Sequence, residues 1–448
     1  MADSGNETMK IGIIGGGAMG LTAAYELAKS GYSVVLFESQ DSLGGMAASF
    51  NWNGITIEKY YHFICLPDVA YLEFIKELGL ERRQRWCATK MSYFYQGRLY
   101  RWGDPLSLLR FPGLSLTQKF RYGLNVLYSK YSKDWRKMEN VSAEKWLKGW
   151  LGEEAFEVLW KALLEFKFGD QAHELSAAWI WSRIRRVANS RKKLIQENYG
   201  YLDGGTSVFF KALAEKIEQS GGKIELSSPI SKINIRNGRV QGIQTPRREY
   251  PLDALISTIP LPEFLDIPAD LPESYRRTLA NIGYIGIMCA LFLLKKRLTE
   301  NFWLNIKDPR IKIPGLIEYT NLNQASSFRG LSLIYIPQYM PESDPRYAKP
   351  DKDVAEEYSS YLGIINPGLA ASDIVDFKII RARHAQPIPG VGFSKRLPPL
   401  KSPVEGLFVA DTSFYFPEDR TIDQSISLGK RLARGISHGA EEARSKGR

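Results

Sequence analysis

Three glycines near the start of the chain have the spacing of a loop that binds a nucleotide diphosphate. Gly15, Gly17 and Gly20 form a G-x-G-x-x-G pattern, and Glu38 follows 18 residues after Gly20. The first glycine permits a tight turn, the second lets the backbone approach a pyrophosphate, and the third lets a helix pack closely on a strand. An acid at this distance accepts hydrogen bonds from the adenosine ribose. The pattern therefore predicts a dinucleotide site.

The elements that must position these residues occur in the required order. Residues 10–14 form a short apolar run that predicts a strand, and residues 21–29 carry apolar side chains at helical spacing before Gly31. Residues 33–37 predict a second strand that leads to Glu38. The N-terminus of the helix supplies free N–H groups and partial positive charge to phosphates. The sequence therefore predicts a Rossmann-type unit.

A second glycine pair indicates by resemblance which dinucleotide binds. Residues 43–46 (LGGM) resemble the second glycine motif of the superfamily of flavin-containing amine oxidases, protoporphyrinogen oxidases and phytoene desaturases, and more distantly that of UDP-galactopyranose mutases. This resemblance implies a non-covalently bound FAD. Many members have a basic residue after the glycine pair that reaches the pyrophosphate. Here that position holds Met46, so this contact must come from elsewhere or from backbone amides.

Two later segments extend the resemblance. Residues 201–206 (YLDGGT), a helical pattern over 208–219 and Ile230 resemble the stretch whose backbone meets the adenine. Residues 406–411 (GLFVAD) resemble the closing flavin motif, with Ala410 where the superfamily usually has Gly. The resemblance implies that the acid of this motif faces the ribityl or pyrophosphate portion.

The last helix is expected to open near residues 419–426, with its N-terminus under the flavin pyrimidine ring. The full set of residues implied to bind FAD is Gly15, Gly17, Ala18, Met19, Gly20, Glu38, Ser39, Gly44, Gly45, Met46, Ile230, Asp411, Ile422, Asp423, Gln424 and Ser425.

The candidate catalytic residues lie in segments that the superfamily brings alongside the isoalloxazine ring. His62 could act as an acid or base, donate a hydrogen bond or pack as an aromatic neighbour, and Tyr61 could stack on or line the substrate. His384 lies in a stretch that resembles the one running past the reacting face. Arg420 follows the closing acid and would either act near the flavin or pair with Glu418 or Asp423.

The sequence also limits the reaction. No second G-x-G-x-x-G follows a strand, so the expected electron acceptor is oxygen, a quinone or another diffusible acceptor rather than NAD(P)H. Many amine oxidases of the superfamily carry a lysine that holds a water at flavin N5. The corresponding run here, residues 284–294, has none, which argues against simple amine oxidation.

The predicted fold class is α/β, with a discontinuous Rossmann-type FAD-binding domain and a mixed α+β substrate-binding domain. The first would comprise residues 9–60, 199–259 and 377–438, and the second residues 61–198 and 260–376. Within the second domain, helical patterns cover 70–78, 117–130 and 143–150, and β-rich runs cover 288–294, 316–319 and 331–336.

Basic and aromatic residues concentrate in residues 82–137, which we expect to be a helical region. The segment contains only two acids, Asp104 and Asp134, and Phe120, Leu124 and Leu127 fall on one helical face. Such a mixture suits peripheral contact with an anionic membrane. The alternative is a solvated cationic face over an ordinary core.

Bulk composition narrows the class of protein. The formal net charge is +11, but no common nucleic-acid-binding motif is present, so nucleic acid is not an expected partner. Residues 1–9 predict a short polar leader rather than a signal peptide, and the apolar run at 282–294 is too short to span a membrane. Three separated cysteines and four histidines predict neither disulfide nor metal site. We expect a cytoplasmic protein, peripheral on the inner face of the cytoplasmic membrane if the basic region binds lipid.

These observations favour an FAD-dependent oxidoreductase of the oxidase or desaturase type. It would pass a hydride to flavin N5 from a hydrophobic substrate of isoprenoid, lipid-linked or tetrapyrrole kind. The alternative is a redox-neutral isomerase or sugar-nucleotide mutase, in which basic residues hold a diphosphate. A non-catalytic flavin-bound protein is the third hypothesis.

Overall fold

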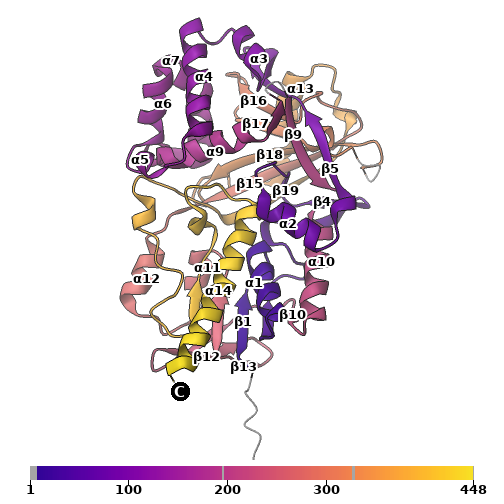
Figure 1. Ribbon diagram of the computed structural model, residues 1–448. Helices are drawn as coiled ribbons and strands as arrows, with labels where there is room; N and C mark the ends of the chain where they lie inside the picture. Colours follow the sequence, from indigo (N-terminus) through magenta and orange to yellow (C-terminus); the bar gives the residue numbers. More distant parts are fainter. Residues whose placement is uncertain (1–7, 194–195, 325–327, 447–448) are drawn as a thin grey trace, which may run out of the picture.

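A five-stranded parallel sheet forms the lower part of the molecule (Figure 1). The computed structural model describes residues 8–193, 196–324 and 328–446. The strand order is β10(Lys223–Glu225), β2(Ser33–Phe37), β1(Lys10–Ile14), β14(Ala254–Ser257) and β20(Leu407–Val409). The strands predicted over 10–14 and 33–37 are confirmed as β1 and β2. The sheet therefore brings together segments that are far apart in the sequence.

Helices cover one face of this sheet and a smaller sheet lies against the other. The helical layer consists of α1(Ala18–Lys29), α2(Val69–Glu77), α10(Thr206–Gln219) and α14(Ile422–Lys446). The opposite layer consists of β11(Lys232–Arg236), β12(Arg239–Gln244), β13(Glu249–Pro251), α11(Leu261–Leu265) and α12(Glu273–Ala280). Ile11 and Ile13 of β1 pack into the helical layer, whereas Ile14 packs into the other. This alternation along the strand makes a three-layer, Rossmann-type arrangement.

A seven-stranded mixed sheet forms the centre of the molecule. Its order is β19(Ile374–Pro387), β15(Tyr284–Leu294), β18(Ser332–Met340), β17(Gly315–Glu318), β16(Trp303–Lys307), β6(Met91–Tyr95) and β7(Arg98–Trp102). Helix α13(Asp351–Ile365) packs on one face. The other face packs against Tyr60 and the hairpin of β3(Ser49–Trp52) and β4(Ile55–Glu58). A domain boundary at residue 377 would fall inside β19, and the division into domains stays a prediction.

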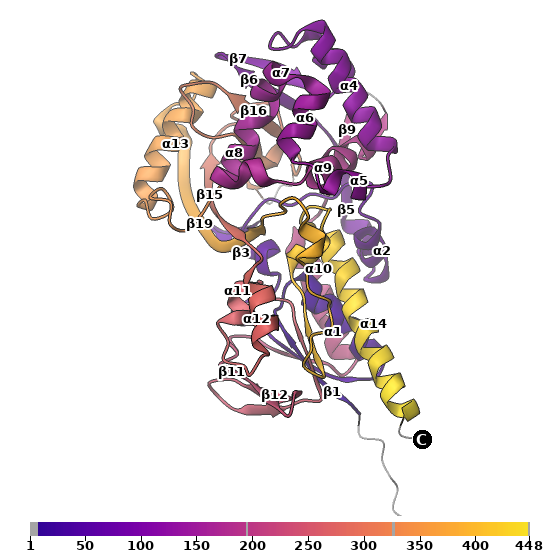
Figure 2. The same ribbon diagram turned by 90° about the vertical axis from the view of Figure 1, so that its left-hand side faces the viewer.

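A group of helices covers the upper end of the molecule (Figures 1 and 2). It contains α3(Pro105–Arg110), α4(Leu116–Tyr131), α5(Arg136–Glu139), α6(Ala143–Leu151), α7(Glu153–Phe156), α8(Ala162–Phe168) and α9(Ala177–Asn189). Helix α4 begins where the Ser115 side chain accepts a hydrogen bond from the Gln118 backbone, a capping box. Helices α4 and α6 match the patterns predicted over 117–130 and 143–150 to within one residue at each end.

The expectation that residues 82–137 are helical throughout was wrong. Residues 84–102 form three strands, β5(Gln84–Thr89), β6 and β7, and helices start only at Pro105. The reason is a tight hairpin, because Gln96 and Gly97 both have positive φ angles, +49° and +78°. Two such residues make a turn that joins adjacent antiparallel strands. Strand β5 instead pairs with β9(Gln196–Leu202), which also pairs with β8(Arg191–Lys193).

The two large sheets and their helices give the α/β fold expected from the sequence, a Rossmann-type unit joined to a mixed α+β layer. Within the described residues, no helix combines the length and apolar composition that a membrane crossing requires.

Candidate functional site

The glycine loop after β1 leaves open space where a pyrophosphate would bind. Gly15 has a φ of +106° and donates its N–H to the Phe37 carbonyl at 2.9 Å. A Cβ on Gly20 would lie 2.0 Å from the Gly15 carbonyl oxygen, so only glycine allows α1 to pack this closely. A Cβ on Gly17 would meet nothing within 4 Å. Gly17 therefore faces free space at the N-terminus of α1, beside the loop residues Ala18 and Met19.

The second glycine pair lies directly against this loop. The Gly44 N–H donates to the Gly16 carbonyl at 2.8 Å, and a Cβ on Gly45 would lie 3.4 Å from Gly17 Cα. Both Gly44 and Gly45 have positive φ angles, +113° and +56°. Two glycine backbones thus approach each other without side chains between them. The Met46 side chain packs against a hydrophobic core cluster instead.

Glu38 is fixed at the edge of the glycine loop. Its Oε2 accepts a hydrogen bond from the Gly16 N–H at 2.6 Å, and its Oε1 accepts from the Gln40 N–H at 2.9 Å and from the Ser39 hydroxyl at 3.2 Å. The Ser228 N–H donates to the Glu38 carbonyl at 2.8 Å, which brings the segment before half-buried Ile230 alongside. The acid expected at the ribose and the residue implied at the adenine therefore lie on one edge of the sheet.

The closing acid Asp411 is buried and surrounded by donors from three segments. Its Oδ1 accepts from the Ser413 N–H at 2.9 Å, and its Oδ2 accepts from the Leu261 N–H at 3.2 Å and from the Tyr284 hydroxyl. Burial raises the pKa of Asp411. His384 belongs to this same group, because its ring lies edge-on to Tyr284 at 6.0 Å and its Nδ1 is 3.5 Å from Glu263 Oε1.

The residues at the start of α14 face several different partners. The Gln424 N–H donates to Thr421 Oγ1 at 3.0 Å, and Ser425 Oγ lies 2.8 Å from the Tyr415 hydroxyl. Asp423 accepts from the Tyr71 N–H at 3.0 Å and so caps α2. Its side chain therefore ties two helices together, and any contact with a cofactor would come from the helix backbone. Ile422 lines a small cavity described below.

His62 is held in one tautomer by its own backbone. Its Nδ1 lies 2.8 Å from the Tyr60 carbonyl oxygen, and since a carbonyl only accepts, Nδ1 carries the proton. Burial lowers the pKa of His62 to about 4, the hydrogen bond to Tyr60 opposes this, and the charge of Arg420 adds to it. At neutral pH the free Nε2 is therefore an acceptor or base. The expectation that His62 donates a hydrogen bond to the flavin or substrate does not fit this tautomer.

Tyr61 belongs to an aromatic group and Arg420 to a polar one, and both lie near His62. Tyr61 stacks with Phe63 at 6.3 Å and meets Trp303 edge-on at 5.7 Å. Arg420 donates to Gln386 Oε1 at 2.7 Å and to the Tyr339 hydroxyl at 2.9 Å, and it also bonds the Ala385 carbonyl. These are the partners of Arg420 in place of the expected neighbouring acid. The structure thus groups His62, Tyr61 and Arg420, whereas His384 lies with Asp411.

Glu58 is a site residue that sequence reasoning missed. It is buried at the end of β4, where its Oε1 accepts from the Thr206 N–H at 2.9 Å and its Oε2 has no partner among the described groups. Burial raises the pKa of Glu58 to about 7, against the hydrogen bond from Thr206. It lines a cavity of about 10 Å³ with His62 and Tyr319, enough for one water. The sequence feature that could have indicated Glu58 is its position four residues before His62.

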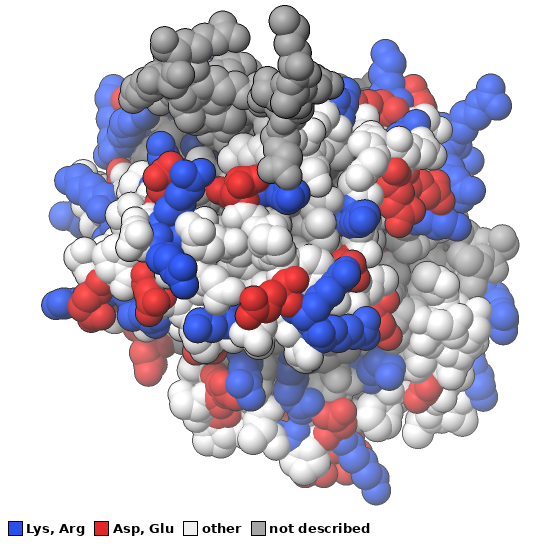
Figure 3. Space-filling view, turned by 90° about the horizontal axis from the view of Figure 1, so that it is seen from below, with Lys and Arg blue, Asp and Glu red and all other residues white. Residues whose placement is uncertain are grey.

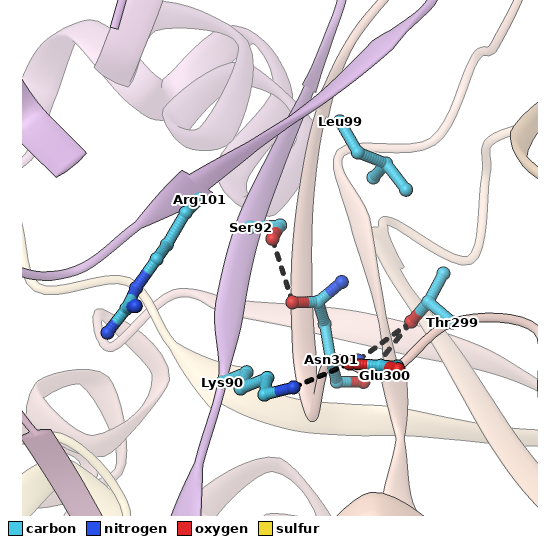
Figure 4. Close-up of a pocket in the computed structure, with 7 residues that line it drawn as sticks. All are labelled: Lys90, Ser92, Leu99, Arg101, Thr299, Glu300 and Asn301. Atoms are coloured by element: carbon cyan, nitrogen blue, oxygen red, sulfur yellow. Dashed lines mark hydrogen bonds and ion pairs between the residues drawn. The ribbon is translucent and has the colours of Figure 1, made fainter. Parts of the chain in front are cut away.

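A larger pocket, of about 380 Å³, lies apart from these residues and is lined by side chains of β6, β7 and residues 299–301 (Figure 4). Lys90 pairs with Glu300 at 2.5 Å, and Ser92 donates to Asn301 at 2.7 Å across it. These four polar side chains pair with one another. Within the described residues, no group of three His, Cys, Asp or Glu side chains is arranged to hold a metal ion.

Comparison with known proteins gives matches over most of the chain. A family model described as flavin containing amine oxidoreductase matches residues 20–436. The chain is 24% identical over 282 residues to a 15-cis-phytoene desaturase from Synechococcus elongatus, covering 56% of this chain and 58% of the desaturase. It thus spans less than two thirds of that curated relative.

Solved structures share the fold at lower identity. A structure from Exiguobacterium sp. 255-15, provisionally named a protoporphyrinogen oxidase, has a TM-score of 0.76 at 17% identity and covers 96% of this chain and 99% of its own. A reduced UDP-galactopyranose mutase has a TM-score of 0.75 at 18% identity and covers 96% of this chain and 94% of its own.

Proposed function

The chain belongs to the family of flavin-containing amine oxidoreductases, a class of FAD-dependent enzyme, and we propose that it oxidises a hydrophobic substrate by hydride transfer. The observation that carries the proposal is the pair of facing glycine backbones. Gly17 and Gly45 approach each other at the N-terminus of α1 with open space beside Gly17. This is the cradle that a pyrophosphate needs and that a side chain would fill.

The chain's own residues suit the remaining parts of FAD. Glu38 is positioned for the ribose, the backbone near Ile230 for the adenine, and the segment from Asp411 to the start of α14 for the ribityl chain and the ring. Bound FAD would supply the hydride acceptor. His62, with its free Nε2, would accept the proton that the substrate loses as a double bond forms. Oxygen or a quinone would then take the electrons.

The surroundings of Tyr61 support a hydrophobic substrate. Phe63, Trp303 and Tyr335 lie around its ring at 6.3, 5.7 and 6.1 Å between ring centres. Aromatic rings provide a large apolar contact area and carry few polar atoms that need hydrogen-bond partners. An isoprenoid, lipid-linked or tetrapyrrole substrate has this character. The grouping of Tyr61 with neutral His62 would also exclude water from the reacting carbon.

We further propose that the helices α3 and α4 rest on an anionic membrane surface. Apolar side chains stand exposed along both helices: Leu106, Leu109, Leu116, Phe120, Leu124, Leu127, Tyr128 and Tyr131. Phe120 and Tyr131 are 67% and 71% exposed. Arg110 is exposed among them, and Arg121 and Lys130 are partly exposed. At the lower end of the molecule, by contrast, basic and acidic side chains are interspersed (Figure 3). A hydrophobic substrate would reach such an enzyme from the bilayer.

An absorbance spectrum of the purified protein tests the function. Anaerobic chemical reduction followed by mixing with oxygen would show an oxidised flavin spectrum that bleaches and quickly returns. A flavin that stays reduced in air would instead favour a quinone acceptor or the redox-neutral isomerase or mutase. Failure of added FAD to bind would overturn the proposal.

A further inference from the structure

Two basic side chains pair with one carboxylate between the upper helices and the segment after β20, and a third lies nearby. Lys167 Nζ of α8 lies 3.5 Å from Asp419 Oδ2, and Arg183 of α9 bonds the same oxygen. The side chains of Lys167, Arg183 and Asp419 are 11%, 27% and 17% exposed. Arg420, the next residue along the chain, adds a third basic group. We call Lys167, Arg183, Asp419 and Arg420 the basic cluster.

Aromatic rings form the walls of the basic cluster. Trp179 lies beneath both Lys167 and Arg183, with its ring centre 4.8 and 5.0 Å from their charged groups. Tyr339 lies between Lys167 and Arg420, at 5.2 and 5.8 Å from its ring centre, and its hydroxyl accepts from Arg420 at 2.9 Å. Trp179 therefore contacts two of the three cations, and Tyr339 contacts Lys167 and Arg420.

The positive charge of the basic cluster exceeds its negative charge. Asp419 is the one carboxylate paired with Lys167 and Arg183, and its Oδ1 has no partner among the described groups. The nearby Asp68 is already paired with Arg186 at 2.9 Å. Burial lowers the pKa of Lys167 well below its usual range, and the positive charge of Arg183 is the second cause of this shift. Burying cations without matching anions costs free energy, so the arrangement favours an added anion.

We propose that Lys167 and Arg183 bind an oxyanion of the substrate, a carboxylate or a phosphate, with Arg420 beside them adding positive charge. An arginine fork and a lysine point charge are the groups that recognise such oxygens. The site adjoins Tyr61, because Tyr339, whose hydroxyl accepts from Arg420, packs against the same hydrophobic cluster as Tyr61. The anion would anchor one end of the substrate while its apolar part lies along Tyr61. This inference rests on the proposed function and names the substrate class: a hydrophobic molecule with an anionic end.

Calorimetric titration of the FAD-loaded protein tests the site with three probes of equal chain length. Decanoate and decyl phosphate carry the two anions, and decanamide is the uncharged control. We expect at least one anion to bind and decanamide to bind roughly tenfold more weakly or not at all. Lys167→Met should weaken anion binding roughly tenfold or more. Lys161→Met, which removes an exposed lysine paired with Glu157 just before α8, should leave binding unchanged.

Two further variants keep the result interpretable if Lys167→Met fails to fold. Arg183→Gln should weaken anion binding as well, and Arg183→Lys should restore part of it because the charge returns. Preference for decanoate or decyl phosphate identifies the anion. Equal binding of decanamide, or anion binding unchanged in both Lys167→Met and Arg183→Gln, overturns the proposal. The flavin spectrum of each sample separates this result from failure of the proposed function, since loss of FAD binding in the wild type would count against the function alone.

Discussion

His62 Nδ1 and the Tyr60 carbonyl oxygen, two residues apart, are joined by a 2.8 Å hydrogen bond that fixes the histidine tautomer. The bond keeps the ring in one orientation and leaves Nε2 without a proton. Since burial lowers the pKa of His62 to about 4, the ring is neutral throughout the physiological range. The ring is therefore already unprotonated at Nε2 when a substrate binds, and its lowered pKa makes it a weaker base than a free imidazole.

The stability of the protein should depend on pH through His62. The folded-state pKa of about 4 lies below the ordinary value of 6.5, so the unfolded chain binds the proton more readily. The contribution of neutral His62 to the free energy of unfolding is present above pH 6.5. It is lost as the pH falls toward 4, by up to about 3 kcal/mol. Denaturant unfolding of the wild type and of His62→Gln should show a difference that grows as the pH rises through this range. A pH-independent difference would contradict the assigned burial.

Glu58 should give a pH dependence of the opposite sign. Its folded-state pKa of about 7 lies above the ordinary 4.5, so its contribution is present below pH 4.5 and is lost as the pH rises through 7. Glu58→Gln keeps the acceptor for the Thr206 N–H and removes the charge. Relative to the wild type, this variant should gain about 3 kcal/mol in unfolding free energy between pH 4.5 and pH 8. Equal pH profiles for the two proteins would show that Glu58 is hydrated or paired.

The cofactor cradle predicts a selective effect at Gly17. A Cβ there meets no protein atom within 4 Å, so Gly17→Ala should leave the fold intact and obstruct the pyrophosphate. We expect FAD to bind roughly tenfold more weakly or worse, about 1.4 kcal/mol. Gly123→Ala on α4 is the matched control, because a Cβ at Gly123 also meets nothing within 4 Å. Flavin fluorescence measures the affinity, and wild-type FAD affinity in Gly17→Ala would place the pyrophosphate elsewhere.

The exposed face of α4 predicts binding to lipid. Replacing both Phe120 and Leu127 by Ser removes apolar groups that each contribute about 1.5–3 kcal/mol when fully buried, so partition onto anionic vesicles should fall at least roughly tenfold. The control replaces Val375 and Val391, which are 43% and 41% exposed, by Ser. Vesicle sedimentation at low and at high salt measures the electrostatic and the apolar contributions to membrane binding. Wild-type binding by the α4 variant, or binding by no variant at all, would show that this face does not contact a bilayer.

The glycine loop could be predicted from the sequence because all of its determinants are local. The strands at 10–14 and 33–37 have the bounds of β1 and β2. Helix α1 begins at Ala18 rather than at residue 21, because Gly17 already serves as its N-cap. The glycine pattern thus forms the first turn of the helix, a detail that apolar periodicity does not reveal.

The basic cluster could not be predicted in this way. Lys167 and Arg183 lie on different helices, and Asp419 and Arg420 come from the far end of the chain. Nothing in the local sequence of Lys167 distinguishes it from a solvated lysine. Its surroundings depend on how α8 and α9 pack over the segment after β20, which only the assembled fold determines. The burial of Glu58 beneath the N-terminus of α10 could not be predicted from the sequence for the same reason.

The order of strands in the parallel sheet affects how the chain acquires its structure during synthesis. Strands β1 and β2 are made first, yet β14 and β20 come from residues 254–257 and 407–409. Helix α14 packs on α1 so closely that a Cβ at Gly429 would lie 2.6 Å from the Met19 carbonyl oxygen. The N-terminal unit therefore cannot complete its packing until these late segments have been synthesised. Until then, its apolar surface stays exposed to solvent. Proteins with such long-range pairing fold slowly and are prone to aggregate, so we expect recombinant yield to depend on chaperones and on low growth temperature.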